Sequence, residues 1–384
     1  MKILTVAIPN HHFFQWVNQL EEAGYEVYWF DITDSGPSSQ KIPWVTQIKG
    51  WKLKWDFPLR FRIKGALPKL YETIQQWNEH AVEDAFAKAY QEIRPDIIHC
   101  FEMQLSGLPI LSVIQDLPVP LIYSSWGSDL FDFKRLGVSQ NAATAFLKRT
   151  DYLITDCKRD QAIAKANGFE ETFLGVFPGN GGLTIEASSI KRLEHRNTIL
   201  IKGYDDGVGK ASIVLNALER VDKAILQDKQ IIIYSADRSI ETQIKNSERL
   251  SLLAMQIYSR HSFINNVQLL KVMGNSCIHI ANSLSDGMPN ALLEAMGMGA
   301  FPIQSNPGGA TEEVITDGKN GFLIQDPLDI NGIANLIEKA LDDKSLRKSA
   351  QEFNTAFIRK NYNRTILQSQ IVSLYQQVYT NRNS

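Results

Sequence analysis

The sequence has little cysteine and no long apolar run. Its 384 residues include only three cysteines, Cys100, Cys157 and Cys277, which lie far apart and show no C-x-x-C spacing. This pattern argues against a disulfide framework or a zinc ribbon and favours a reducing compartment. No stretch approaches the roughly 20 apolar residues that a membrane span needs, and the first residues are polar too early for a signal peptide. We expect a cytoplasmic protein and keep peripheral contact with the inner face of the membrane as an open alternative.

An excess of charge of one sign is also missing. The chain has 40 basic and 42 acidic residues, so its formal net charge is −2. This balance excludes a globally basic nucleic-acid-binding protein and a strongly acidic disordered tail, and we expect no nucleic-acid partner. The length and the 44% content of hydrophobic residues are instead typical of two globular domains.

Short β-branched runs alternate with stretches of helical spacing, and the alternation starts twice. The predicted strands are 2–8, 27–30, 97–100, 121–124, 152–155, 172–177 and, after a turn-rich break at 178–182, 198–202, 230–234, 254–257, 277–280 and 301–304. Apolar runs between helices indicate parallel sheets that are buried on both faces. We predict an α/β fold with two doubly wound, Rossmann-like domains facing a cleft. The predicted parts are 1–180, 181–360 and a C-terminal helix at 361–384, for which a return to the N-terminal domain stays open.

The segment Ser283–Gly299 follows one of these strands and carries the strongest functional signal. Pro289 suits the first turn of a helix, and Gly299 suits its end. The loop Ser285–Met288 therefore precedes a helix N-terminus, where backbone N–H groups and the helix dipole favour a phosphate or a sugar hydroxyl.

Glu294 is unusual because it lies inside an otherwise apolar helix, on the same face as Asn290. One interpretation is a solvated stripe on a half-buried helix. The other is a carboxylate that accepts two hydrogen bonds from a vicinal diol, such as the hydroxyls of a ribose. Position alone leaves both open.

The spacing Asp286-x7-Glu294, followed by Pro307-Gly-Gly-Ala-Thr-Glu-Glu-Val-Ile-Thr-Asp-Gly-Lys-Asn-Gly-Phe-Leu-Ile324, resembles the E-x7-E and glycine-rich motifs of GT-B glycosyltransferases. The similarity is to retaining enzymes of family 4 (glycosyl transferases group 1). It implies a nucleotide-diphosphate sugar as the donor substrate and no cofactor. It places Asp286, one methylene shorter than the usual Glu, at the transferred sugar, and Glu294 at the ribose. The implied donor-binding residues are Gly287, Met288, Pro289 and Asn290. Glu312 and Glu313 leave the second motif ambiguous by one residue.

Sugar transfer leaves a charged diphosphate, which needs a metal ion or fixed cations. The chain has no Asp-x-Asp sequence of the kind that often holds the metal, so we expect no metal site. Lys202, at the end of a strand, and Lys210, at the start of a helix, are the predicted cations. They are eight positions apart, whereas the family's Arg and Lys are five apart.

Four residues of the first half are candidates for the acceptor or sugar side. His11 follows the first strand, His99 lies in a later one, and Ser125-Trp-Gly-Ser-Asp129 resembles the family's H-G-x-D loop. In that loop Trp126 occupies the position of the His, and Gly127 follows it. A structural role for the two histidines stays open, and so does one for Glu102, which follows the strand of His99.

The segment 48–69 combines cations with aromatic residues. Its basic residues are Lys49, Lys52, Lys54, Arg60, Arg62, Lys64 and Lys69, and its aromatic residues are Trp51, Trp55, Phe57 and Phe61. This composition suits contact with anionic lipid head groups or a lipid-diphosphate acceptor. The alternative is a loop whose aromatic side chains pack on the domain.

These observations together predict a retaining, metal-independent glycosyltransferase. It would move a sugar from a nucleotide-diphosphate sugar to a hydroxyl of a sugar, lipid-linked or other acceptor, in bacterial-type polysaccharide or glycolipid synthesis. The alternatives are a non-catalytic, nucleotide-sugar-binding partner subunit and another GT-B enzyme such as an epimerase.

Overall fold

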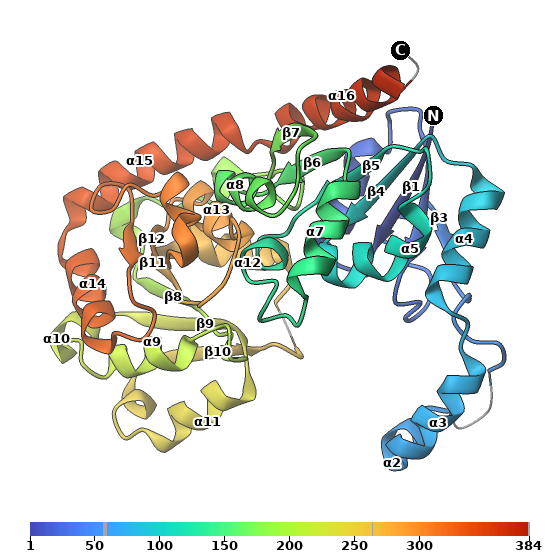
Figure 1. Ribbon diagram of the computed structural model, residues 1–384. Helices are drawn as coiled ribbons and strands as arrows, with labels where there is room; N and C mark the ends of the chain where they lie inside the picture. Colours follow the sequence, from blue (N-terminus) through green and yellow to red (C-terminus); the bar gives the residue numbers. More distant parts are fainter. Residues whose placement is uncertain (57–59, 263, 383–384) are drawn as a thin grey trace. The chain divides into compact units, whose positions relative to one another are not determined.

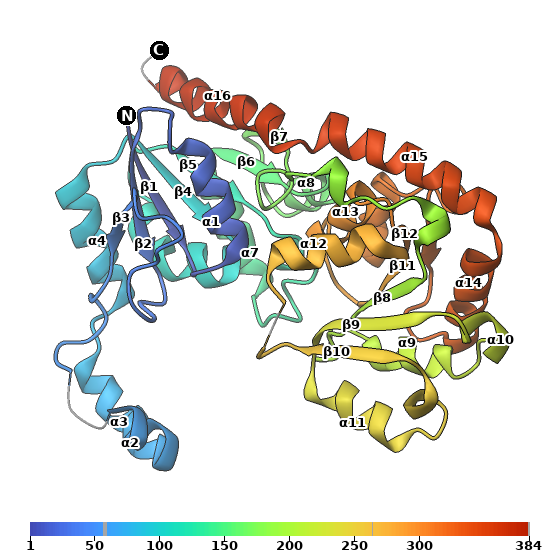
Figure 2. The same ribbon diagram turned by 180° about the vertical axis from the view of Figure 1, so that it is seen from behind.

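The computed structural model describes residues 1–56, 60–262 and 264–382, with only the backbone of Phe61. The chain forms two compact units. The first contains Met1–Asp156, Gln161–Gly181 and the C-terminal stretch from Gln368, and the second contains Cys157–Asp160 and Gly182–Leu367. Each unit is built on one parallel β-sheet (Figures 1 and 2).

The sheet of the first unit has seven strands in the order β3-β2-β1-β4-β5-β6-β7. Its strands are β1 (Lys2–Ala7), β2 (Glu26–Asp31), β3 (Thr46–Ile48), β4 (Ile97–Phe101), β5 (Leu121–Ser124), β6 (Tyr152–Thr155) and β7 (Thr172–Val176). Its helices are α1 (His11–Val17), α2 (Arg60–Ala66), α3 (Pro68–Asn78), α4 (Val82–Ile93), α5 (Leu111–Ile114), α6 (Ser128–Phe131), α7 (Gln140–Arg149) and most of α8 (Lys158–Ala166) and α16 (Arg364–Arg382).

The sheet of the second unit has six strands in the order β10-β9-β8-β11-β12-β13. Its strands are β8 (Thr198–Lys202), β9 (Gln230–Ala236), β10 (Met255–Ser259), β11 (Ser276–Ala281), β12 (Phe301–Ser305) and β13 (Phe322–Ile324). Its helices are α9 (Ala211–Leu218), α10 (Lys223–Leu226), α11 (Arg238–Asn246), α12 (Asn266–Asn275), α13 (Asn290–Gly297), α14 (Ile330–Asp342) and α15 (Lys344–Asn361). The prediction of two parallel, Rossmann-like α/β sheets is confirmed.

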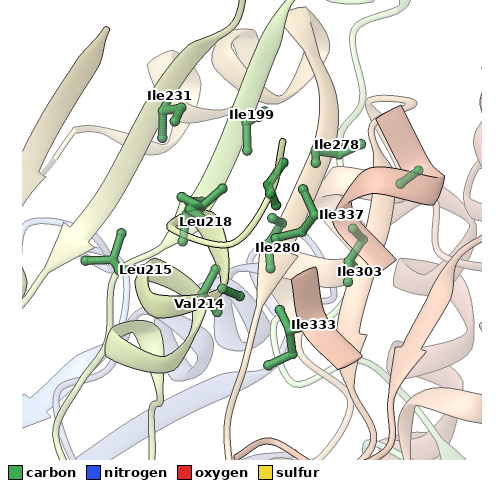
Figure 3. Packing of buried hydrophobic residues seen from close by; sticks show 14 of the residues in the cluster. Ile199, Val214, Leu215, Leu218, Ile231, Ile278, Ile280, Ile303, Ile333 and Ile337 are labelled. Atoms are coloured by element: carbon green, nitrogen blue, oxygen red, sulfur yellow. The ribbon is translucent and has the colours of Figure 1, made fainter. Parts of the chain in front are cut away.

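The core of the second unit lies on both faces of its sheet because successive side chains of a strand point to opposite faces. Ile199 and Ile201 of β8 belong to the cluster that contains residues of α9 and α14, as Figure 3 shows for Val214 and Ile333. Leu200, between them, belongs to the cluster that contains residues of α12 and α13. Strands covered on both faces explain why the sequence reads as continuous apolar runs.

The C-terminal helix α16 takes part in the core of the first unit. Tyr375 is fully buried, and its hydroxyl accepts a hydrogen bond of 3.0 Å from Trp16 Nε1. Farther along α16, Arg382 forms an ion pair of 3.3 Å with Asp96. The end of the chain therefore stabilises the unit in which the chain begins.

A short break separates the helices α3 and α4. α3 ends at Asn78, and α4 begins at Val82. The buried side chain of Asn78 bonds both backbone groups of Trp55, at 3.0 Å to the amide and 2.9 Å to the carbonyl. This contact between residues distant in sequence ends the helix, and local periodicity does not reveal it.

Within the part of the chain that the structure describes, none of the helices combines the length and the apolar character that crossing a membrane requires.

Candidate functional site

A cavity of about 280 Å³ opens at the carboxyl ends of the central strands of the second sheet. It lies where β8 and β11, which are neighbours, both end. β8 continues to β9 on one side and β11 to β12 on the other, so this is the point where the strand order reverses and where doubly wound sheets bind ligands. The lining residues are Lys202, Tyr204, Asp206, Val208, Gly209, Ala281, Asn282, Ser283, Ser285, Asp286 and Gln304.

Backbone hydrogen bonds hold the two loops that form the wall of this cavity. The amide of Lys210 donates a hydrogen bond to the carbonyl of Asn282 at 2.9 Å. The amide of Leu284 donates one to the carbonyl of Val208 at 3.0 Å. The Asp206 carboxylate accepts from the amide of Gly209 at 3.0 Å. The loop after β8 is therefore fixed against the loop after β11.

Gly209 is required in this loop because a side chain has no room there. A Cβ atom at this position would lie 2.4 Å from the carbonyl oxygen of Tyr204. We expect Gly209→Ala to displace the loop and to weaken nucleotide binding at least about tenfold, with a stability loss of about 1–3 kcal/mol. Calorimetric titration with a nucleoside diphosphate measures the first effect. Gly65→Ala, where a Cβ meets nothing within 4 Å, is the control, and equal affinity of both variants would contradict the role of the loop.

Lys202 is the cation of this cavity. It ends β8, lines the cavity, and its ammonium lies 4.7 Å from the centroid of the Tyr204 ring. Its positive charge lowers the pKa values of both Asp286 and Glu294, against the effect of their burial. The structure thus brings together three of the four residues that the sequence predicted as catalytic.

Lys210, the fourth, has a different position. It caps the N-terminus of α9, and its backbone bonds Asn282 of the cavity wall. Among the residues that the structure describes, however, the lining of the cavity does not include Lys210. The backbone of Lys210 is therefore part of the support of the cavity wall.

Asp286 lies in the loop between β11 and α13 and is half-buried. Burial raises the pKa of this carboxyl, while Lys202, the amide of Gly287 and Arg159 lower it. The amide of Gly287 donates to Asp286 Oδ1 at 3.0 Å. The carboxylate therefore faces the cavity next to a cation, where it can accept hydrogen bonds from a hydroxyl-rich ligand.

Glu294 lies in α13 and is 9% exposed. Asn266 Nδ2 of α12 donates to its Oε1 at 2.9 Å. Burial raises its pKa to about 7, and Asn266 and Lys202 limit the rise. The interpretation of Glu294 as part of a solvated stripe is wrong, because its carboxyl is buried and hydrogen-bonded next to a cation.

The other predicted donor-binding residues surround the start of α13. Pro289 is the residue before its first turn, and Asn290 begins it, as the sequence predicted to within one residue. The side chain of Met288 is 3% exposed and belongs to a core cluster with Leu292 and Leu293. Met288 therefore has only its backbone to offer a ligand.

Two side-chain amide oxygens of the cavity lining have no hydrogen-bond partner within the described part of the chain. They are Asn282 Oδ1 and Gln304 Oε1, and both residues are buried. A buried polar atom without a partner is costly, so such atoms mark places where a ligand or water bonds. The cavity is therefore suited to a polar ligand with hydrogen-bond donors.

Tyr204 and Arg260 were not predicted from the sequence. The Arg260 guanidinium lies 4.1 Å from the centroid of the Tyr204 ring and forms ion pairs of 3.0 Å with Asp206 and 3.2 Å with Asp237. Arg260 follows the end of β10, so attention to the carboxyl end of every strand would have found it. Tyr204 thus interacts with two cations, Lys202 and Arg260.

The second motif contributes a structural carboxylate. Glu313 accepts hydrogen bonds from the amides of Lys158, at 2.9 Å, and Arg159, at 3.0 Å, all within the second unit. Glu312 instead bonds Asn306 at 2.9 Å. Arg159, also not predicted, forms a buried ion pair with Asp160 and lowers the pKa of Asp286. The ambiguity between the two glutamates therefore concerns support of the site and not its chemistry.

In the first unit, the loops after β1 and β5 bring together His11, His12 and Trp126. The ring centroids of His11 and His12 are 6.2 Å apart, as are those of His12 and Trp126. The backbone of Gly127 has φ +87°, which favours glycine. His12 therefore lies in the same cluster as two of the predicted acceptor-side residues, His11 and Trp126.

His99 does not belong to this group. It is fully buried, and its ring nitrogens lie 2.7 Å from the Tyr375 hydroxyl and 2.8 Å from Ser124 Oγ. Burial lowers its pKa to about 3. The expectation that His99 faces an acceptor is therefore corrected in favour of its structural alternative, because both nitrogens are already bonded inside the core.

Glu102 and Asp129 also accept hydrogen bonds from groups of the protein itself. Asp129 accepts hydrogen bonds from the Tyr123 hydroxyl at 2.6 Å and from the Trp126 amide at 2.9 Å. Glu102 accepts from the amides of Gln104 and Leu105, and burial together with Asp129 raises its pKa to about 8. Asp129, the acid of the loop that resembles H-G-x-D, therefore orients Trp126.

Two family models match the chain and together include both units. Residues 188–357 match the model "Glycosyl transferases group 1", and residues 2–157 match "Glycosyl transferase 4-like". Both halves of the chain thus match glycosyl transferase families. The matched ranges contain Lys202, Asp286 and Glu294 in the first case and His11 and Trp126 in the second, so the family assignment and the site coincide.

Solved glycosyl transferase structures share this fold at low sequence identity. HepE from Anabaena, crystallised with UDP and glucose, is 14% identical with a TM-score of 0.69, over 98% of this chain and 100% of that chain. Sucrose-phosphate synthase from Thermosynechococcus elongatus is 17% identical with a TM-score of 0.70, over 99% of each chain. A UDP-forming α,α-trehalose-phosphate synthase from Burkholderia xenovorans is 13% identical with a TM-score of 0.67, over 100% of this chain and 99% of that chain. No curated protein matches the sequence significantly.

Proposed function

We propose that this chain transfers a sugar from a nucleotide-diphosphate sugar to a hydroxyl acceptor, with retention of anomeric configuration and without a metal ion. The observation that carries the proposal is the cavity at the ends of β8 and β11, which joins a cation, Lys202, to a carboxylate, Asp286. A second carboxylate, Glu294, interacts with the same cation, since the charge of Lys202 lowers its pKa as well. The cation can bind the diphosphate of the donor, and the two carboxylates can accept hydrogen bonds from the hydroxyls of its sugar and its ribose.

The chemical step requires stabilisation of the charge that develops on the leaving diphosphate. A fixed ammonium at the edge of a sheet and the backbone amides at the start of α13 are aimed at such a charge before the reaction begins. Lys202 supplies the ammonium, and Lys210 adds long-range attraction beside the site. Asp286 holds hydroxyls of the transferred sugar, and Glu294 holds the ribose.

Retention follows in this proposal from attack by the acceptor on the face that the diphosphate leaves, with a phosphate oxygen taking the proton from the acceptor hydroxyl. Asp286 is next to Lys202 and bonded to the amide of Gly287, an arrangement that suits holding a substrate better than covalent attack. The proposed acceptor is a sugar or a lipid-linked hydroxyl, as in polysaccharide or glycolipid synthesis, and His11 and Trp126 of the first unit are proposed to bind it.

Uridine nucleotides are the first donors to test, because HepE was crystallised with UDP and the trehalose-phosphate synthase is UDP-forming. At a concentration of about 100 times Kd, the correct nucleoside diphosphate should stabilise the protein by about 2.7 kcal/mol. Thermal unfolding with UDP, GDP and ADP, each with and without a chelator, measures this. We expect one nucleotide to raise Tm and the chelator to change nothing. A shift that disappears with the chelator would contradict metal independence.

A non-catalytic, nucleotide-sugar-binding subunit is the second candidate. It is favoured by Trp126, which occupies the position of the family's His and has no ionisable group. Both candidates predict the Tm shift, but only an enzyme releases nucleoside diphosphate from the donor. Product analysis by mass spectrometry after incubation with donor and a panel of sugar acceptors separates them, since any transfer or donor hydrolysis above the uncatalysed rate excludes the binding-only subunit.

A further inference from the structure

Helix α3 exposes a stripe of apolar side chains. Leu67, Leu70, Ile74 and Trp77 recur at intervals of three and four residues and therefore share one face of the helix. Leu67 is 54% exposed, Leu70 49% and Trp77 74%. Figures 1 and 2 both show α2 and α3 extending beyond the edge of the first sheet. Among the described residues, most of this stripe stays exposed, and such an apolar surface marks an interaction surface.

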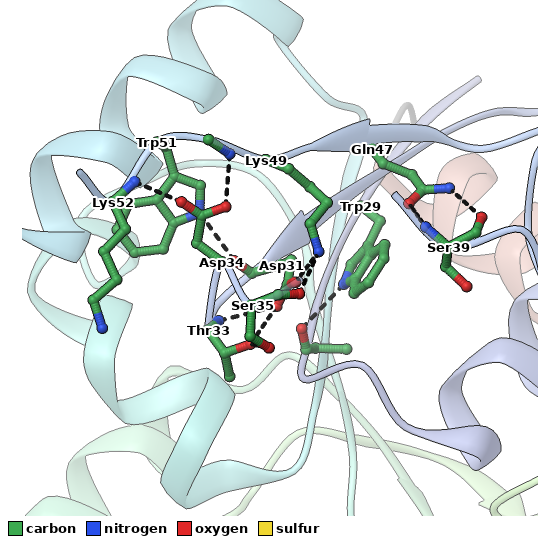
Figure 4. A network of polar contacts seen from close by, with 12 residues as sticks. Trp29, Asp31, Thr33, Asp34, Ser35, Ser39, Gln47, Lys49, Trp51 and Lys52 are labelled. Atoms are coloured by element: carbon green, nitrogen blue, oxygen red, sulfur yellow. Dashed lines mark hydrogen bonds and ion pairs between the residues drawn. The ribbon is translucent and has the colours of Figure 1, made fainter. Parts of the chain in front are cut away.

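The beginning of the basic segment 48–69, in contrast, belongs to the domain itself. Lys49 forms an ion pair of 2.6 Å with the buried Asp31 (Figure 4). Trp51 stacks on Phe30 with 5.0 Å between the ring centroids. The amides of Gly50 and Lys52 bond Asp34. These contacts confirm, for this part of the segment, the interpretation as packing on the domain. Phe57 lies outside the described residues, and only the backbone of Phe61 is described.

The exposed cations of the segment lie in α2, in α3 and in the chain that precedes them. Lys54, Arg62, Lys64 and Lys69 are all exposed, and the ammonium of Lys54 bonds the carbonyl of Trp77 at 3.0 Å. Two neighbouring acids are neutralised, Asp56 by Arg60 at 3.4 Å and Glu79 by Lys52 at 3.6 Å. Glu72 of α3 is also exposed, so four exposed cations stand against one exposed acid that has no ion pair among the described residues. The surface near the stripe is therefore net positive, although the whole chain has a net charge of −2.

We propose that the α3 stripe, together with Trp55 and the flanking lysines and arginine, docks on an anionic lipid surface. Tryptophan and leucine enter the boundary between head groups and acyl chains, while cations beside them attract anionic head groups. The same cations would repel each other across a symmetric contact with a second copy of this face, which favours lipid over self-association. Docking of this kind holds the first unit at a membrane and does not depend on the proposed reaction.

Co-sedimentation with vesicles tests the docking, using the full chain. We expect binding to phosphatidylcholine vesicles that contain phosphatidylglycerol, weaker binding at about 0.5 M than at about 0.05 M salt, and little binding to phosphatidylcholine alone. The double variant Leu70→Ser, Trp77→Ser should bind at least about tenfold more weakly. Arg62→Glu with Lys69→Glu should lose most of the salt-sensitive part. Because all four residues are exposed, Tm should stay unchanged.

Leu252→Ser with Phe353→Ser is the matched control, since these side chains are 85% and 54% exposed in the second unit, and it should bind vesicles like the wild type. Absence of vesicle binding by the wild type, or equal binding by the α3 double variant, overturns the proposal. So does a dimer in sedimentation velocity that the α3 variant alone dissociates, because a second copy would then cover the stripe. Nucleotide-induced Tm shifts, measured on the same variants, report on the donor site separately.

Discussion

Replacing Lys202 with alanine is expected to lower kcat/KM for glycosyl transfer about 100- to 1000-fold. The ammonium lines the cavity and influences both carboxylates of the site, so its removal deletes the nearest fixed positive charge at the leaving diphosphate. Removal of one preorganised group of this kind costs about 2.7–4 kcal/mol of transition-state stabilisation. Steady-state kinetics with the nucleotide sugar identified by Tm shift provide the measurement.

The comparison with two other lysines makes this prediction specific. Lys210→Ala should lose activity as well, by about tenfold, but less than Lys202→Ala, because Lys210 stands beside the cavity. Lys245→Ala, at an exposed position of α11, should act like the wild type. Wild-type turnover by Lys202→Ala would show that this cavity is not where the diphosphate departs, even if the family assignment holds.

Glu294→Gln is expected to have opposite effects on stability and on binding. Burial raises the pKa of Glu294 from 4.5 to about 7. Between these two pH values, the folded protein therefore keeps a proton that the unfolded chain releases. The stability that the neutral carboxyl contributes is fully present below about pH 4.5 and is lost as the pH rises through 7. At pH 8 the variant, which cannot ionise, should therefore be more stable than the wild type, by up to roughly 3 kcal/mol. Denaturant unfolding at pH 5 and pH 8 measures the difference.

The same variant should bind nucleotide more weakly at pH 8, by about tenfold or more, because a carboxylate accepts stronger hydrogen bonds from ribose hydroxyls than an amide oxygen does. A nucleotide that lacks the 2′ and 3′ hydroxyls is the control. The wild type should discriminate strongly against it, and Glu294→Gln should discriminate little. Equal discrimination by both proteins would remove Glu294 from the ribose site, and no stability gain at pH 8 would contradict its ionisation there.

Much of the fold follows from patterns that are local in sequence. The strands β5, β6 and β8 begin and end at the predicted residues, because each is a short apolar run bounded by polar residues. The first turn of α13 was predicted from Pro289, and the predicted C-terminal helix at 361–384 corresponds to α16. Short edge strands such as β3 and β13, of three residues each, carry too few residues for a pattern.

The candidate site was predicted in part. Lys202 and Asp286 follow strands that the sequence marks clearly, and the E-x7-E-like spacing connects Asp286 to Glu294. Arg260 and Arg159 were missed because each reaches its place through pairing of elements that are far apart in the chain. His99 was misplaced for the same reason, since its partner Tyr375 is 276 residues away.

Alternation of apolar runs with helical spacing was enough to predict two parallel α/β sheets, and two motifs with their order and spacing indicated a glycosyl transferase. Those are properties of neighbouring residues, and hydrophobic burial acts on them directly. Which polar groups share a cavity, and which are consumed by hydrogen bonds within the core, depends on strand order and on the packing of side chains. Only the tertiary structure therefore decided that Lys202 lines the cavity, that the Lys210 backbone supports its wall, and that the beginning of the basic segment packs on the first domain.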